Sequence, residues 1–104
     1  MKSKVYFADF RASGPKRNGL AKIGLLLEAA GLARAIRPGD LTAIKIHFGE
    51  RGNEAFVSPV LARAVADAVR AAGGKPFFSD TNTLYSGGRH DAVDHLETAA
   101  SHGF

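Results

Sequence analysis

Short apolar runs alternate along the chain with longer stretches in which apolar residues recur every three or four positions. β-prone residues fill 5–8, 41–48 and 75–80, and predict three strands. The stretches beginning at Leu20, Pro59 and Ala92 predict helices. The order β-α-β-α-β-α predicts an α/β fold, a three-layer sandwich with a small parallel sheet and helices packed on its faces.

Local signals place the ends of these helices. Ser58 before Pro59 is typical of a helix start, and Asp91 is a candidate cap for the last helix. Gly31, Gly73 and Gly103 are candidate stop signals. The expected apolar faces are Leu20, Ile23, Leu27 and Ala30 in the first helix, Leu61, Val65 and Val69 in the second, and Val93, Leu96 and Ala100 in the third.

A length of 104 residues fits one domain. The alternation ends on a helix, after which another strand is expected, and three parallel strands leave exposed edges. We therefore interpret residues 1–104 as a single α/β domain, the N-terminal portion of a longer protein and a fragment of a larger doubly wound domain. The alternative is a complete small domain that forms a homo-oligomer through a sheet edge.

Composition narrows the chemistry. The chain has no cysteine, which excludes disulfides, cysteine nucleophiles and cysteine-ligated iron–sulfur clusters within these residues. No apolar run approaches the length of a membrane span, and no secretory segment precedes the first predicted strand, so we expect a cytoplasmic protein without a membrane partner. The net charge is +4, but the basic residues are scattered, so nucleic acid is not an expected partner.

Polar side chains gather where the predicted strands end. In a parallel sheet those ends meet at one edge, which is where ligands bind. The densest groups of polar residues follow the second and third predicted strands, and two further polar residues follow the first. The set is Asp9 and Arg11; His47, Glu50, Arg51 and Asn53; Asp80, Asn82, Tyr85, Arg89, His90, Asp91 and His95. We expect it to line one cleft.

Lys45 and His47 share one face of the second predicted strand, because side chains alternate along a strand. Lys45 is either an edge residue whose ammonium reaches water or a lysine that faces an anion. His47 is a structural histidine or a ligand, and Asp80 closes a turn or serves the site. Lys45, His47 and Asp80 are the candidate catalytic residues.

The stretch "SGGRHD" is a weak candidate anion site, since glycine-rich turns before helices leave N–H groups free. Arg89 would pair with the anion. The candidate substrate-binding residues are Arg11, Arg51, Asn53, Asn82, Tyr85 and Arg89. Asp91 and His95 lie on one side of the last helix, as metal ligands or as an exposed pair. The candidate ligands of a divalent metal are His47, Asp80 and His95.

Two stretches, "AIKIHFGERGN" and "DTNTLYSGGRHDAVDHLETAASHGF", resemble the domain-of-unknown-function family 362. Many members of that family carry iron–sulfur or ferredoxin-like descriptions. The resemblance implies a longer protein, with a cysteine-rich region that holds iron–sulfur clusters beyond the C-terminal end of this chain. Its matched positions include Lys45, His47, Asp80, Arg89 and His95.

Three hypotheses remain open from the sequence. In the first, the domain holds an anionic substrate of a redox enzyme, with or without a metal at His47 and Asp80. In the second, it binds a small anionic molecule without chemistry of its own. In the third, it is an assembly domain whose polar residues only fix its loops.

Overall fold

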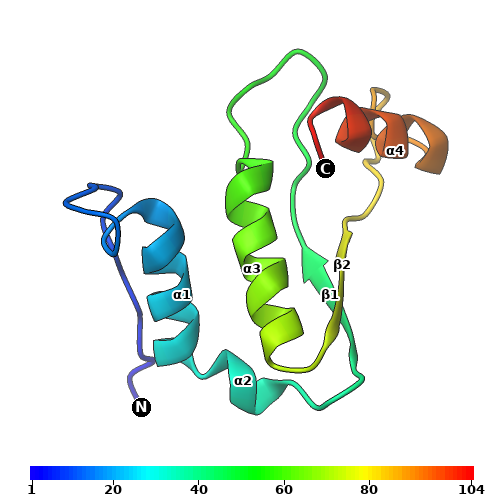
Figure 1. Cartoon of the computed structure of the whole chain (residues 1–104). Coiled ribbons are helices and arrows are strands. Elements are labelled where there is room, and N and C mark those ends of the chain that lie inside the picture. Colours follow the sequence, from blue (N-terminus) through cyan, green and yellow to red (C-terminus); the bar gives the residue numbers. More distant parts are fainter.

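The computed structural model describes residues 1–104, which form four helices and a two-stranded parallel sheet. The elements in chain order are α1 (Gly19–Ala30), α2 (Leu32–Ala35), β1 (Leu41–Lys45), α3 (Pro59–Ala71), β2 (Lys75–Ser79) and α4 (Ala92–Ser101). This mixture of helices with a parallel sheet confirms the α/β class (Figure 1).

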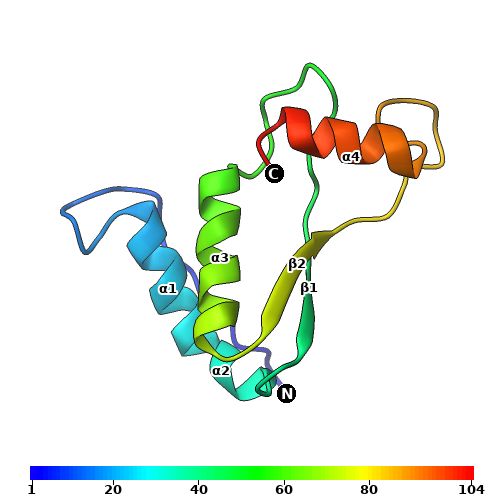
Figure 2. The same cartoon turned by 45° about the vertical axis from the view of Figure 1, so that its right-hand side comes forward.

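The layers follow one another as α1, α3 and sheet. Helix α1 packs on α3 and α3 packs on β2, while α4 lies across the ends of the strands (Figures 1 and 2). Helices α1 and α3 therefore lie on one side of the two-stranded sheet, and its other face is uncovered (Figures 1 and 2). On the uncovered face Leu41 is 78% exposed and Phe77 is 49% exposed.

The strand predicted at residues 5–8 is not formed. Val5 and Phe7 are exposed, and this segment runs beside α1, away from the sheet (Figure 1). A strand is held by hydrogen bonds to a neighbouring strand, and this segment has no such neighbour. Apolar composition alone therefore could not place it in the sheet.

The two observed strands pair in register from Leu41 with Lys75 to Lys45 with Ser79. Both are shorter than predicted, since the chain leaves the sheet at Ile46 and at Asp80. A small core forms just beyond their ends, where apolar side chains from the loop after β1 meet α3 and α4. It contains Ile46, Phe48, Ala62 and Ala99, with Phe78 and Phe104 packed against it.

The predicted helix ends are confirmed. The Ser58 hydroxyl accepts the Val60 N–H at the start of α3, and the Asp91 carboxylate accepts the N–H groups of Val93 and Asp94 at the start of α4. Gly31 ends α1 with a φ of 81°, a left-handed conformation that glycine adopts readily.

The predicted apolar face of α4 is wrong. Val93 is 67% exposed and Leu96 is 72% exposed. The buried residues of this helix are His95, Thr98 and Ala99. The polar side chains of His95 and Thr98 face inward because they form hydrogen bonds with the neighbouring loops. Helix α1 likewise has no buried residue on its predicted face.

Candidate functional site

The loops after β1 and β2 lie together at the carboxyl ends of the parallel strands. Contacts between residues 47–51 and residues 80–98 join them, although the two segments are separated by the whole of α3. This is the convergence predicted from the sequence for the second and third predicted strands. It follows from the parallel pairing of β1 with β2.

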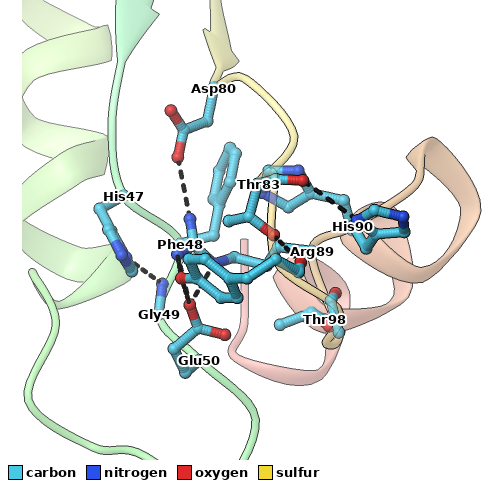
Figure 3. A network of polar contacts seen from close by, with 12 residues as sticks. His47, Phe48, Gly49, Glu50, Asp80, Thr83, Arg89, His90 and Thr98 are labelled. Carbon is cyan, nitrogen blue, oxygen red and sulfur yellow. Dashed lines mark hydrogen bonds and ion pairs between the residues drawn. The ribbon is translucent and has the colours of Figure 1, made fainter.

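Arg89 stands at the centre of this arrangement. Its side chain is only 5% exposed and lies between two carboxylates, those of Glu50 and Asp80 (Figure 3). Its Nε donates to Glu50 at 3.0 Å and its Nη1 donates to Asp80 at 3.4 Å. Its Nη2 donates to Glu50 and to the Tyr85 hydroxyl. Four of the five guanidinium N–H groups are thus already engaged by the protein.

These contacts set the ionisation of the cluster. The hydrogen bond from Arg89, with a second from the Tyr85 hydroxyl, lowers the pKa of Glu50 from 4.5 to about 2. The same carboxylate raises the pKa of Tyr85, because the phenol donates to it and is stabilised in its protonated form. Glu50 is therefore an anion, and Tyr85 a neutral donor, throughout the neutral range.

Asp80 links this cluster to the end of β1. Its side chain is 5% exposed and lies 3.4 Å from the Lys45 ammonium. The same carboxylate accepts the Thr81 N–H at 2.9 Å. The side chain of Lys45 is 73% exposed, so most of it faces water. Asp80 thus closes the turn that the sequence offered as one of its two roles, and its carboxylate also pairs with Lys45.

His47 is exposed beside Lys45. Its Nδ1 accepts the Gly49 N–H at 2.9 Å (Figure 3). A nitrogen that accepts an N–H carries no proton, so the neutral ring holds its proton on Nε2. His47, Lys45 and Asp80 line an open hollow of about 400 Å³, together with residues 81–85 and Arg89. The imidazole can offer this hollow an N–H donor.

Arg51 fastens the loop after β1 to α4. Its Nε donates to the Thr98 hydroxyl at 2.9 Å, and that hydroxyl donates to the Gly88 carbonyl at 2.6 Å. Its Nη2 lies 3.7 Å from Asp94 and 3.6 Å from Glu97. The guanidinium predicted to hold a substrate is thus engaged with the helix, which fixes the two loops against each other.

The candidate metal ligands do not form a metal site. The chain contains no group of three or more His, Cys, Asp or Glu side chains arranged to hold a metal ion. His95 instead faces Asn82, with 3.0 Å between its Nδ1 and the amide Oδ1. A metal on Nε2 of His47 would require the proton on Nδ1, which conflicts with the Gly49 hydrogen bond. The residues present do not fit a divalent metal.

Three candidate substrate residues lie away from the hollow: Arg51, which is engaged with α4, and also Arg11 and Asn53. Arg11 pairs with Asp9 at 3.2 Å beside α1, since the first predicted strand, which would have carried it to the sheet, is not formed. Asn53 accepts the Ala55 N–H at 2.7 Å and closes a turn. Asn82 and Tyr85 do line the hollow, with Arg89 beneath them.

Sequence reasoning gave no role to two residues that organise the site. Glu50 belongs to the predicted group of strand-end residues but not to the candidate site residues. Its carboxylate nevertheless accepts hydrogen bonds from both Arg89 and Tyr85. Thr98 is fully buried and was placed on no face of its helix. Its position three residues after His95 was the available signal, since residues three apart share a helix face.

Comparison with known proteins identifies the family of this chain. The model of the family described as "Domain of unknown function (DUF362)" matches residues 42–104, which include β2, all of β1 except Leu41, and all the residues of the hollow. The chain belongs to this family.

A curated relative is the thylakoid-associated protein sll1697 of Synechocystis sp. It is 39% identical over 66 residues, which are 60% of this chain and 21% of that protein. The chain thus spans about a fifth of the curated relative that it matches. No solved structure matches the chain. None of its helices is long and apolar enough to span a membrane.

Proposed function

We propose that this domain binds a small anionic substrate at the carboxyl ends of β1 and β2. The observation that carries the proposal is the exposed ammonium of Lys45, held at the rim of the hollow by the buried Asp80 carboxylate. A cation fixed at a concave polar surface is suited to a carboxylate or phosphate group.

The distribution of charge supports an anion rather than a cation. The two acidic side chains at the hollow are engaged with Arg89, and Asp80 is almost fully buried. The accessible charge is therefore the ammonium of Lys45. His47 adds a neutral N–H donor beside it, since its Nδ1 is occupied by the Gly49 N–H.

Arg89 takes a different role from the one that the sequence indicated. Four of its five N–H groups are occupied by Glu50, Asp80 and Tyr85, so it has no free pair of donors to offer a substrate. We assign it as a positioning residue that holds Asp80, and Asp80 in turn holds Lys45. Lys45 and His47 remain the residues proposed to touch the substrate.

The resemblance to proteins with iron–sulfur descriptions supports placing this site in a redox protein. The electron carrier would then lie outside these residues, because the 104 residues contain no cysteine. In this proposal the domain contributes substrate binding and orientation, with Lys45 and His47 as donors to the anionic group. A binding domain without catalysis is the alternative, and it shares the same anion site.

Thermal unfolding of the chain in the presence of inorganic phosphate tests the proposal. Phosphate is expected to raise the unfolding temperature in a saturable way, because a ligand that binds only the folded state stabilises it. Lys45→Gln should abolish this increase. Lys75→Gln is the matched control, since Lys75 lies on the same sheet face at the opposite end of the strands.

Equal phosphate stabilisation of the wild type and of Lys45→Gln would contradict the proposal, as would loss of the effect in Lys75→Gln alone. Replacing phosphate by chloride at equal ionic strength separates specific binding from general screening.

A further inference from the structure

A second cavity, lined largely by apolar side chains, lies between the end of β2 and α4. Its volume is about 260 Å³, and its walls include Phe48, Phe78, Leu96 and Ala99. Apolar cavities smaller than this bind aromatic molecules the size of benzene in other proteins. A compact organic molecule of roughly ten non-hydrogen atoms is therefore of suitable size.

One polar group in this wall has no partner. His95 lines the cavity and is 94% buried, being 6% exposed, and its Nε2 forms no hydrogen bond in the protein. Buried side-chain nitrogens are nearly always hydrogen-bonded, so an isolated one is a candidate contact for a ligand.

The hydrogen bond on the other side of the ring determines what Nε2 can do. Nδ1 lies 3.0 Å from Oδ1 of Asn82, an oxygen that can only accept, so Nδ1 carries the proton. In the neutral ring Nε2 is then an acceptor. Phe48 meets the imidazole edge to face, with the ring centroids 5.6 Å apart and the planes at 83°. The acceptor is thus held in one orientation before any ligand arrives.

We propose that this cavity binds a small, mainly apolar molecule through a single hydroxyl or N–H group that donates to Nε2 of His95. A phenol has this chemistry, with a ring for the walls formed by Phe48, Phe78 and Leu96 and a hydroxyl for the imidazole. The site is separate from the hollow at Lys45, although Asp80 and Asn82 border both. The inference therefore does not depend on anion binding.

Titration of the full chain with phenol and with toluene, followed by NMR of the histidine ring nitrogens, tests the proposal. Phenol is expected to produce a saturable shift of the ¹⁵N resonance of His95 Nε2. Toluene should enter the same cavity, but it has no group that donates a hydrogen bond. It should therefore not produce the shift of the His95 Nε2 resonance that phenol produces. Phenol should also bind roughly twofold to tenfold more tightly than toluene, the usual range for one hydrogen bond.

Two variants check the location. Ala92→Phe places a bulky ring in the cavity wall and should abolish binding of both probes, while Ala92 itself is exposed and tolerates replacement. Val93→Phe is the matched control, because Val93 is 67% exposed on the same helix and does not line the cavity. It should leave both affinities unchanged.

Any of three results would overturn the proposal. They are the absence of saturable binding of either probe, equal affinities for phenol and toluene, and binding that survives Ala92→Phe. The decisive shift is measured on the wild-type chain, so the test does not require a folded His95 variant. Phosphate should leave the His95 resonance unchanged, which keeps the outcome distinguishable from that of the Lys45 site.

Discussion

At the scale of single residues, the site depends on one buried arginine. Arg89 is engaged by two carboxylates and a phenol through four of its five N–H groups, so it shapes the site without offering a ligand a pair of donors. Burying a guanidinium is costly unless its donors are paired, and here Glu50 and Asp80 provide that pairing. The ammonium of Lys45 joins the same network, because it lies 3.4 Å from the Asp80 carboxylate.

The lowered pKa of Glu50 predicts a specific dependence of stability on pH. The unfolded chain takes up a proton on Glu50 near its ordinary value of 4.5, whereas the folded chain does so only near 2. The contribution of this carboxylate to stability is therefore complete above about pH 4.5 and is lost as the pH falls towards 2. Urea unfolding of the wild type and of Glu50→Gln across this range measures it.

At neutral pH the wild type should be more stable than Glu50→Gln, and the difference should shrink on acidification. Glu54→Gln is the control, since Glu54 is exposed and forms no ion pair, and its profile should parallel the wild type. A difference between wild type and Glu50→Gln that stays constant from pH 7 to pH 2.5 would contradict the assignment.

At the scale of the elements, the loop after β1 is tightly restricted at Gly49. Gly49 has a φ of 89°, and a Cβ added there would lie 2.5 Å from the Phe56 ring and 2.9 Å from Nδ1 of His102. His102 in turn lies with its Nδ1 2.7 Å from the Phe48 carbonyl. This glycine is therefore required both by its backbone conformation and by the packing around it.

Gly49→Ala is accordingly expected to lower the free energy of unfolding by more than about 2 kcal/mol, combining left-handed strain with a steric clash. Gly52→Ala separates the two causes. Gly52 has a φ of 81°, but a Cβ there would meet nothing within 4 Å, so only the strain applies. Chemical unfolding of both variants measures the difference, and equal losses would show that the packing around Gly49 is not restrictive.

The elements also show which features the sequence could predict. The caps Ser58 and Asp91 and the stop at Gly31 depend only on neighbouring residues, and the structure confirms them. The buried face of α4 could not be predicted from periodicity. It is decided by distant partners, since Thr98 bonds to Gly88 and to Arg51.

The candidate site was predictable to a similar extent. The order of the elements alone predicts parallel strands. Parallel strands in turn place Lys45, His47 and Asp80 at one edge of the sheet, as observed. Arg11 is expected at the sheet edge only if residues 5–8 form a strand. That strand would need a neighbouring strand to pair with, and local sequence does not show whether one is present. The hydrogen bonds of Arg89 to Glu50, Asp80 and Tyr85 could not be predicted either, because they depend on side chains from two separate loops.

At the scale of the whole molecule, the layers leave the site on an open face. Helix α3 covers one side of the sheet, and the side that bears Leu41, Phe77 and Lys45 carries no helix (Figure 2). Asp80 and Asn82 line both the polar hollow and the apolar cavity. The chain spans about a fifth of its Synechocystis relative, so we assign these sites to the domain and not to a whole protein.

The central claim is that an anion binds at Lys45 and His47, and NMR titration with inorganic phosphate tests it most directly. The Nζ resonance of Lys45 and the ring nitrogens of His47 should shift together with one dissociation constant, while the Nζ resonance of Lys75 stays in place. Shifts of all lysines in parallel, or no shift at Lys45, would contradict the account.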